Sequence, residues 1–394
     1  GIGLISLLLL LGHQLQEKFE KNLAGIDLVI GAKGSPLQLI LNSMYHIDTP
    51  TGNITLQQAR PFLHPKHPLI EQAIPLSMGD NYRGYRILGT IPEILSWYDA
   101  GVARGRVWAD NFEATIGAAV ARELELELGD RFHSSHGFTD DASLAHDDAQ
   151  AFEVVGILAP TGTVIDQLIL TTTQSFWLVH EHQDQEAVYK KDDSTVGEGA
   201  VNPPPSLLEA SPDREITSLL VRFRGRNFQT LNLQRTINEN TEMQAASPAI
   251  EINRLFTLIG SGEQVLRALA VVITVVSGIS IFIALFSSLR DRRYELALMR
   301  VMGASPARLF FLLILEGLIL AGLGYLTGLA ISHGGMLIVA SVMKSGYRYT
   351  FDAWQFLPQE ALLLAGALLI GFLAALLPAR QAAQTDIAET LSGG

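Results

Sequence analysis

The sequence predicts a membrane protein with four α-helical spans, the first of them truncated in this chain, and a large extracytoplasmic α+β domain. Hydrophobic residues make up 48% of the 394 residues, charged residues only 17%, and the mean hydropathy is +0.25. Three long apolar runs lie in the last third of the chain, which is typical of membrane spans. The preceding 250 or so residues are acidic and alternate between strand-like and helix-like patterns.

The N-terminal residues 2–11 are apolar, but they are too few to cross a bilayer. The core of a signal peptide is one interpretation. We favour a first span, at residues 1–12, whose beginning is missing from this chain, because no small-residue cleavage site follows. Instead Leu15, Phe19 and Leu23 recur every four residues, as they would along one side of a helix.

The large segment 13–263 mixes two kinds of hydrophobic pattern. Aliphatic and β-branched runs predict strands at 86–93, 151–158, 165–172 and 216–223. Helical patterns occupy 116–130 and 226–246, so we expect an α+β domain rather than a βαβ array. A further helical pattern at 250–260 continues into the next apolar run. Together with the first helix, which carries Leu15, Phe19 and Leu23 on one side, this second helix is predicted to form a two-helix stalk that joins the membrane part to the outer domain.

The three long apolar runs predict the remaining spans. The run 265–289 contains Arg267 as its only charge, and the run 309–330 contains only Glu316 and trails on to Met343. The last run, 361–377, ends at Pro378. Because about 20 apolar residues cross a hydrocarbon core of about 30 Å, we assign spans to 264–289, 309–343 and 361–378. Buried helices of a soluble protein are the alternative, which three such closely spaced runs disfavour.

Charge predicts the orientation of these spans. Residues 264–394 contain 9 Lys/Arg and 7 Asp/Glu, a net charge of +2. Since the whole chain has a net charge of −12, residues 1–263 have a net charge of −14. The connector 290–308 has five arginines, whereas 344–360 has one lysine and one arginine. The positive-inside rule therefore places 290–308 and the tail 379–394 in the cytoplasm, and 13–263 and 344–360 outside. The acidic balance argues against a nucleic-acid partner.

No enzyme site stands out. The absence of cysteine excludes disulfides, thiol nucleophiles and iron–sulfur clusters. The GAKGS segment (31–35) lacks the spacing of a phosphate-binding loop, and we interpret it as a tight turn after a strand. The C-terminal LSGG (391–394) resembles the start of the ABC-ATPase signature, but no Walker A sequence precedes it, so this chain has no nucleotide-binding domain.

Histidines concentrate in the outer segment, where seven of the ten lie between His64 and His182. His133, His136 and His146 lie among four aspartates within 16 residues, and imidazole with carboxylate suits Zn²⁺. These three are the candidate metal ligands. An exposed polar loop with incidental histidines is the favoured alternative, because no two of them have tight helical spacing.

Two features of the spans concern helix packing. Glu316 lies about 10 Å into its span, where we favour a structural hydrogen bond over a proton relay. Small residues recur every four positions, which lets helices approach closely; they are Gly324 and Gly328 in one span and Ala367, Gly371 and Ala375 in the next.

The stretch RRYELALMRVMGASPARLFFLLILEGLILAGLGYLTG (292–328) resembles the permease family that includes MacB, LolC/LolE and FtsX, the mechanotransmission-type (type VII) ABC transporters. The residues that fall on the family pattern are Glu295, Arg300, Gly303, Ala304, Ser305, Glu316, Gly324 and Gly328. The ending PARQAAQTDIAETL (378–391) is also similar, although Ile387 replaces the usual proline. DLVIGAKGSPLQ and GAAVARELELELGD look like elements of the family's periplasmic core domain.

The resemblance implies a non-catalytic permease subunit in a bacterial inner membrane, with a periplasmic domain of MacB core type. ATP and Mg²⁺ would be bound by a separate ABC ATPase dimer, and a second permease copy or homologue would complete the membrane part. A periplasmic adaptor, substrate-binding protein or lipoprotein is the expected outer partner. Lipoprotein release, efflux of hydrophobic compounds and zinc handling remain open as functions, as does an FtsX-like regulator that transports nothing.

The connector between the second and third spans is the expected contact with the ATPase. The segment from Tyr294 to Leu309 is amphipathic, and we expect it to expose Leu296, Met299 and Arg300 to a groove of the partner. A bare basic loop is the alternative. The full set of candidate coupling residues is Glu295, Leu296, Met299, Arg300, Gly303, Ala304 and Ser305.

Overall fold

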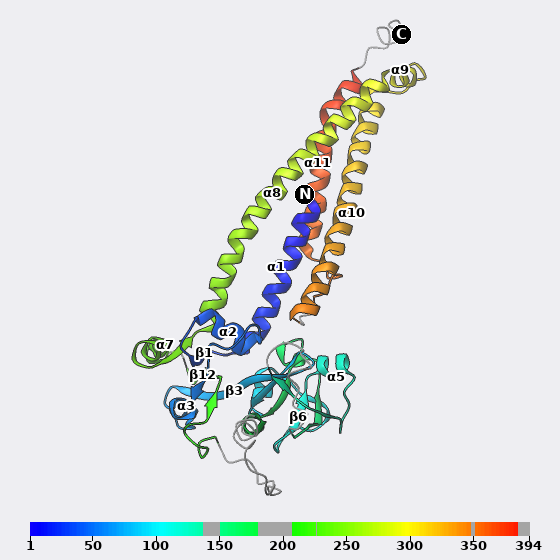
Figure 1. Cartoon of the computed structure of the whole chain (residues 1–394). Coiled ribbons are helices and arrows are strands. Elements are labelled where there is room, and N and C mark those ends of the chain that lie inside the picture. Colours follow the sequence, from blue (N-terminus) through cyan, green and yellow to red (C-terminus); the bar gives the residue numbers. More distant parts are fainter. Residues whose placement is uncertain (137–149, 180–206, 226, 348–350, 385–394) are drawn as a thin grey trace. The chain divides into compact units, whose positions relative to one another are not determined.

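The chain folds into two compact units. The structure, a computed structural model, describes residues 1–136, 150–179, 207–225, 227–347 and 351–384 (Figure 1). A helical unit consists of Gly1–Glu17 and Thr257–Gly394, and a sheet unit consists of Lys18–Phe256. The helices α1 (Ile2–Leu23) and α8 (Pro248–Asp291) contribute residues to both units.

The sheet unit is built on one large mixed sheet. Within the described residues its strands follow the order β13-β1-β12-β3-β4-β10-β6-β9-β5, while β7 pairs with β9, β8 pairs with β3, and β2 pairs with β11 in a separate two-stranded sheet. The strands are β1 (Leu28–Ala32), β2 (Ile54–Thr55), β3 (Ile70–Tyr82), β4 (Tyr85–Thr90), β5 (Val102–Gly105), β6 (Glu113–Ile116), β7 (Arg131–Phe132), β8 (Ser135–His136), β9 (Phe152–Leu158), β10 (Ile169–Thr172), β11 (Glu215–Ile216), β12 (Ser218–Phe223) and β13 (Met243–Ala246). The pairs β4–β10 and β6–β9 are parallel, and the other pairs are antiparallel. The four predicted strands are found as β4, β9, β10 and β12, but the one expected over 165–172 is confirmed only for 169–172, because Val164–Gln167 form a 3₁₀ turn.

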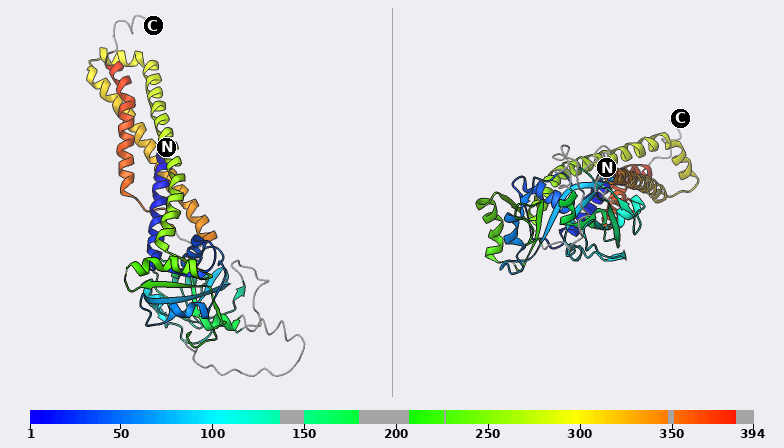
Figure 2. Two further views of the ribbon diagram at one scale, coloured as in Figure 1. Left: turned by 90° about the vertical axis from the view of Figure 1, so that its left-hand side faces the viewer. Right: turned by 60° about the horizontal axis from the view of Figure 1, so that its bottom comes forward.

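The helices of the sheet unit are short and lie around this sheet, as the two views of Figure 2 show. They include α2 (Pro36–Tyr45), α3 (Leu56–Leu63), α4 (Ile94–Trp97), α5 (Ala118–Leu124) and α7 (Phe228–Asn240), with a 3₁₀ turn at Val164–Gln167 and helical residues at 173–179. Two of them are shorter than predicted. The helix expected over 116–130 ends at Leu124, because Glu125 adopts a left-handed conformation with φ of 54°. The helix expected over 226–246 gives way to β13, whose backbone pairs with β1.

The GAKGS segment begins with the last two residues of β1, and the chain bends at Lys33 and Gly34, where the turn after the strand is expected. Ser35 caps α2 by accepting a hydrogen bond from the backbone N–H of Gln38. The Lys33 ammonium donates to the carbonyl oxygen of Asn238 at 2.6 Å and also reaches those of Thr241 and Met243. This lysine therefore binds the carbonyls at the C-terminal end of α7, a stabilising position for a cation.

Aromatic side chains hold together the ends of α1 and α8 that belong to the sheet unit. The Phe19 ring lies 4.7 Å from that of Tyr45 on α2 and 5.5 Å from that of Phe256 on α8. The Tyr45 hydroxyl donates to the Phe19 carbonyl at 3.1 Å. One turn later, the Asn22 side chain accepts a hydrogen bond from the backbone N–H of Val164 at 2.7 Å. These contacts fix both helix ends to the core of the sheet unit.

The helical unit contains parts of α1 and α8 together with α9 (Arg293–Val301), α10 (Pro306–Tyr347) and α11 (Pro358–Ala383). Among the described residues, three helices, α8, α10 and α11, are long and apolar enough to cross a membrane. The helical pattern predicted at 250–260 continues without a break into the second apolar run, so α8 has 44 residues and a length of about 66 Å. About a third of the way along α8, Gly260 and Gly262 face open space on their Cβ sides.

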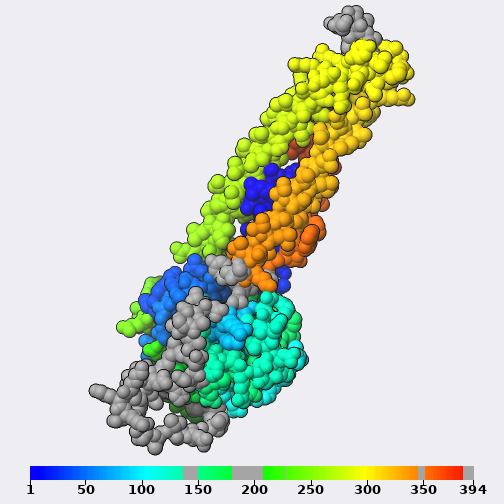
Figure 3. Space-filling model, turned by 45° about the vertical axis from the view of Figure 1, so that its right-hand side comes forward, coloured from blue at the N-terminus to red at the C-terminus, as the bar shows by residue number. Residues whose placement is uncertain are grey.

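Small residues allow close helix packing in this unit. A Cβ on Gly371 of α11 would lie 2.5 Å from the Cβ of Ala321 on α10, and one on Gly317 would lie 2.6 Å from the Cβ of Ala375. A Cβ on Gly3 of α1 would meet the carbonyl oxygen of Gly328 at 2.7 Å. Close packing is thereby confirmed for Gly328, Gly371 and Ala375. Figure 3 shows the first residues of α1, in blue, between α8 and α10.

Candidate functional site

The connector between α8 and α10 is a short helix with a tightly defined end. After α9, Gly303 has a φ of 101°, a region that residues with a Cβ rarely adopt. The backbone N–H of Gly303 donates to the carbonyl of Arg300, and that of Ala304 donates to the carbonyl of Met299. These two bonds form a Schellman motif, which ends α9 and reverses the chain. Ser305 then precedes Pro306, the first residue of α10.

One side of α9 packs against the rest of the helical unit. Leu296 is 6% exposed and Ala297 is fully buried, and Leu296 belongs to an apolar cluster with residues of α8, α10 and α11. Arg300 is half-buried, and its guanidinium donates to the carbonyl of Ala383, the last residue of α11, at 3.2 Å. This bond adds a cation to the C-terminal end of α11, where the carbonyls have no helical partner.

The opposite side of α9 exposes apolar side chains. Its exposed large residues are Tyr294 (61%), Leu298 (44%), Met299 (40%), Val301 (58%) and Met302 (73%). We call these five residues the connector face. Four of them, at 294, 298, 301 and 302, have the spacing that places residues on one side of a helix. An apolar surface of this kind on a short connector, next to several arginines, is suited to bury itself against a partner.

The expected coupling residues divide between these two sides. Glu295, Met299, Gly303 and Ser305 are exposed, and Ala304 is half-buried. The expectation that Leu296 is exposed is wrong, because its side chain belongs to the buried cluster. Arg300 is only partly accessible, since it binds Ala383. Sequence reasoning missed Tyr294, Leu298, Val301 and Met302, although their helical spacing carries the signal.

Glu316 is half-buried on α10, and in the part of the chain that the structure describes no hydrogen bond from its side chain is found. The structural hydrogen bond favoured for Glu316 is therefore not seen. The buried carboxylate of this unit is instead Glu360, at the start of α11, which is 3% exposed.

The histidines expected to bind metal do not form a site among the described residues. His133 is exposed between β7 and β8, the backbone of His136 pairs with that of Asp80, and His146 lies outside the described residues. Searched over those same residues, the chain brings together no three His, Asp or Glu side chains able to hold a metal ion. Zinc binding therefore stays a prediction.

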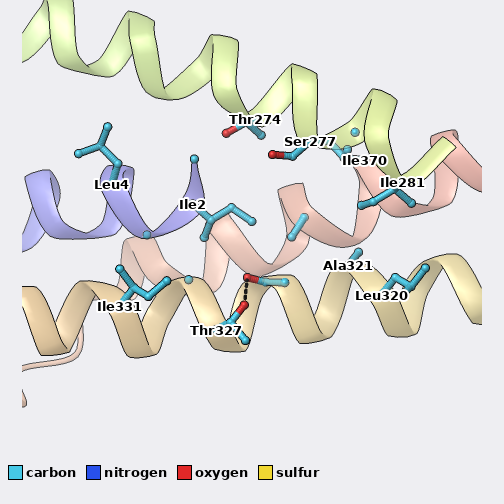
Figure 4. Close-up of a pocket in the computed structure, with 16 residues that line it drawn as sticks. Ile2, Leu4, Thr274, Ser277, Ile281, Leu320, Ala321, Thr327, Ile331 and Ile370 are labelled. Atoms are coloured by element: carbon cyan, nitrogen blue, oxygen red, sulfur yellow. Dashed lines mark hydrogen bonds between the residues drawn. The ribbon is translucent and has the colours of Figure 1, made fainter. Parts of the chain in front are cut away.

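A cavity of 440 Å³ lies within the helical unit (Figure 4). Its walls come from the first residues of α1 and from α8, α10 and α11, and many are glycine or alanine. The hydroxyls of Thr274, Ser277 and Thr327 also line it, but each donates to a carbonyl of its own helix. Gly1, the first residue of the chain, also lines the cavity, which therefore adjoins the start of α1.

Comparison with known proteins places both parts of the chain in one family. The model of the MacB-like periplasmic core domain matches residues 1–206, more than half of the chain, and the model of the FtsX-like permease C-terminal region matches residues 267–387. The connector face lies inside the second match. No curated protein matches the chain.

Two solved structures are similar to it at low identity. The periplasmic region of MacB from Actinobacillus actinomycetemcomitans has 11% identity, covers 60% of this chain and 97% of its own, and gives a TM-score of 0.34. A domain of a Porphyromonas gingivalis protein described as a permease has 14% identity, covers 56% of this chain and 86% of its own, and gives a TM-score of 0.26. At such TM-scores neither likeness supports the assignment, which depends on the family models. By those models, the chain belongs to the family of MacB-like and FtsX-like permeases, membrane proteins with a MacB-like periplasmic core domain in the N-terminal half and an FtsX-like permease region towards the C-terminus.

Proposed function

We propose that this chain is the membrane subunit of an ABC transporter, which couples ATP hydrolysis by a separate ATPase to movement of its periplasmic domain. The observation that carries the proposal is the connector face. Five large apolar side chains are exposed on one nine-residue helix and the residue after it. This helix lies outside the assigned spans, so contact with lipid along a span does not account for their exposure. A groove on the ATPase would remove this surface from water.

The attachments of α9 support its role in transmitting motion. Leu296 and Ala297 pack into the helical unit, and Arg300 binds the end of α11. A displacement of α9 would therefore act on α8, α10 and α11 together rather than bend a free loop. Rigid elements with packed contacts are the means by which such movements travel in proteins.

We assign the connector to the cytoplasm and the periplasmic core domain to the other side of the inner membrane. The arginines at 290, 292, 293, 300 and 308 support this orientation through the positive-inside rule. With α1 as a first span and α8, α10 and α11 as the others, the membrane part has four spans. Because four helices rarely enclose a pathway alone, we infer that a second permease copy or homologue completes it.

What the periplasmic domain acts on separates two functions within this proposal. As a transporter, the assembly would release lipoproteins or expel hydrophobic compounds. As an FtsX-like regulator, it would move the periplasmic domain to activate a partner without transport. Both share the same coupling step.

The coupling step is tested by placing charges on the connector face. We expect the double variant Leu298→Asp/Met302→Asp, purified from native membranes, to lose its bound ATPase and the ATP hydrolysis that accompanies it. Two carboxylates would have to be desolvated in the groove, which costs more than the apolar contact contributes. The matched control is Phe228→Asp, which changes an 80% exposed aromatic of the sheet unit. An ATPase that remains bound and active in the double variant would refute the proposal.

A further inference from the structure

A buried polar cluster joins three helices of the helical unit. The Ser6 hydroxyl of α1 donates to Glu360 Oε1 of α11 at 2.8 Å and lies 2.9 Å from the Ser332 hydroxyl of α10. Next to Ser332, the His333 side chain places its Nε2 3.5 Å from the same Glu360 oxygen. The four side chains are between 0% and 6% exposed. Buried polar groups at such a depth are expensive unless every one of them is satisfied.

The hydrogen bonds of this cluster leave one position without a proton. His333 Nδ1 lies 2.6 Å from the carbonyl oxygen of Ala353, which can only accept, so Nδ1 carries the hydrogen. In a neutral imidazole Nε2 is then a bare acceptor, and it faces the carboxylate, which is also an acceptor. Among the described residues Nε2 has no hydrogen-bond partner. Two acceptors thus face each other across 3.5 Å.

Among the residues that the structure describes, the other groups around the pair do not supply the missing hydrogen. Glu360 Oε2 accepts from the backbone N–H of Leu357, and the Tyr325 hydroxyl donates to the backbone carbonyl of Glu360. Asp352, in the loop before α11, is exposed and accepts from the backbone N–H of Trp354. The rings of Trp354 and Phe356 cover the imidazole, with centroids 6.4 and 4.7 Å away. Of the described residues, Tyr325 and Asp352 are the other titratable groups in contact with Glu360 or with the loop that covers the imidazole, and neither is hydrogen-bonded to Nε2.

We propose that Nε2 of His333 and Oε1 of Glu360 form a binding site for a single proton, which closes a latch between α1, α10 and α11. A proton taken from water would sit between the two atoms as a charge-assisted hydrogen bond and draw them together. Its release would restore two facing lone pairs, which repel in a site with few other polar groups. Because Ser6 is bonded to the same carboxylate oxygen, α1 moves with Glu360 when the proton draws Glu360 and His333 together.

The site lies at the end of the bundle away from the connector. Glu360 is the third residue of α11, whereas Ala383 at the other end of that helix binds Arg300 of α9. In the orientation proposed above, protons would therefore arrive from the periplasmic side. The proton site itself does not depend on that orientation or on the coupling role of α9.

Disulfide formation between α1 and α10 measures the latch directly. The chain has no native cysteine, and a Cβ on Gly328 would lie 3.4 Å from the Cβ of Ile2, close to disulfide geometry. Ile2 and Gly328 each lie four residues before a serine of the latch, so they share its faces. The reference pair is Gly278→Cys/Ile370→Cys between α8 and α11, whose rate corrects for the pH dependence of thiol oxidation.

For the full chain in lipid vesicles, we expect the rate ratio of Ile2→Cys/Gly328→Cys to the reference pair to be higher at about pH 5 than at about pH 8, by roughly tenfold. Adding His333→Phe keeps the ring but removes the proton acceptor, so the ratio should become low and independent of pH. Adding Glu360→Gln supplies an amide N–H that can donate to Nε2, so the ratio should be high at both pH values.

Three results would overturn the proposal. One is a ratio that stays constant with pH in the otherwise unchanged chain. Another is a His333→Phe variant that keeps the full pH dependence. The third is a pH dependence that disappears when a chelator is added, because it would assign the site to a metal cation instead of a proton.

Discussion

At the scale of single residues, the end of the connector helix depends on two residues whose contacts lie within this chain. Gly303 allows the backbone to turn with φ of 101°, and Arg300 joins α9 to α11 through the Ala383 carbonyl. Both residues lie on the family pattern, but the structure gives each a local mechanical reason. The residues that remain free to contact another molecule are their neighbours on the connector face.

Gly303→Ala tests the turn without any steric clash. No atom lies within 4 Å of the added methyl group, so the cost is that of the left-handed backbone alone, about 1–2 kcal/mol. We expect fraying of the end of α9 and a loss of ATPase coupling with membrane insertion unchanged. Gly322→Ala, also in open space but within α10, is the control and should be neutral or slightly stabilising. Equal coupling in the two variants would contradict this role of Gly303.

A second residue-scale prediction concerns acid stability of the sheet unit. The Arg106 guanidinium, which donates to both oxygens of Glu113, and the backbone N–H groups of Ala109 and Asp110 lower the pKa of that carboxyl to about 2. Because this pKa lies below the ordinary value of 4.5, the group stabilises the fold above pH 4.5. The stabilisation is lost as the pH falls from about 4.5 through about 2.

Thermal unfolding of the full chain between those pH values checks this. Glu113→Gln should lower the melting temperature at neutral pH and make it less sensitive to acid. Glu153→Gln is the control, since Glu153 pairs with Arg131 at 2.7 Å but its side chain is 42% exposed, against 15% for Glu113. A melting temperature of Glu113→Gln that falls with acid as steeply as that of the unchanged chain would argue against the assignment.

At the scale of elements, α1 and α8 share one attachment in the sheet unit. Phe19, Tyr45 and Phe256 bring together α1, α2 and α8, and Asn22 adds a hydrogen bond to the first residue of the 3₁₀ turn. The sequence predicted that the two helices form a stalk, because their apolar residues recur at helical spacing. The sequence could not predict that α2 contributes to this attachment, since Tyr45 is separated from both helices along the chain.

Phe256→Ala should loosen this attachment. Loss of a half-buried ring and its edge contact with Phe19 is expected to cost about 1–3 kcal/mol of the stability of the sheet unit and to reduce ATPase coupling. Phe228→Ala, at a position that is 80% exposed, should change stability by no more than about 0.5 kcal/mol. Hydrogen exchange of the Phe19 and Tyr45 segments would report the loosening, and unaltered exchange would count against it.

The α10–α11 contact gives a matched pair of glycine variants within one helix. Gly371→Ala would place a methyl 2.5 Å from the Cβ of Ala321 and 2.8 Å from the Gly317 carbonyl, so we expect it to cost about 1–3 kcal/mol by overpacking. Gly366→Ala on the same helix meets nothing within 4 Å and should be tolerated. Melting temperatures in detergent distinguish the two, and equal values would mean that α10 and α11 do not pack as described.

Hydrophobic patterns explain which elements could be predicted and which could not. Long apolar runs and helical spacing predict α8, α10 and α11 well, because membrane spans leave a strong local signal. The same patterns do not say which side of a short helix is buried, which is why Leu296 was placed on the wrong side of α9. His333 and Glu360 belong to different helices, so their pairing follows only from the packing of α10 on α11.

At the scale of the whole molecule, the family assignment and the distribution of arginines predict where each part lies. Single cysteines test it without background, because the chain contains none. In intact spheroplasts, a membrane-impermeant thiol reagent should label Ser211→Cys, an exposed position of the sheet unit, and should leave Met302→Cys unlabelled until the membrane is opened. The reverse pattern would invert the proposed orientation.

The length of α8 has a consequence for where this helix can bend when force is transmitted along it. At about 66 Å the helix is roughly twice as long as the hydrocarbon core is thick, so a large part of it stands in water. Glycine weakens a helix by about 1 kcal/mol relative to alanine, and Gly260 and Gly262 have no neighbouring side chain to brace them. Bending of α8 therefore costs least free energy at the three consecutive positions 260–262. Replacing both glycines by alanine would make the helix stiffer there without introducing a contact with any neighbouring residue.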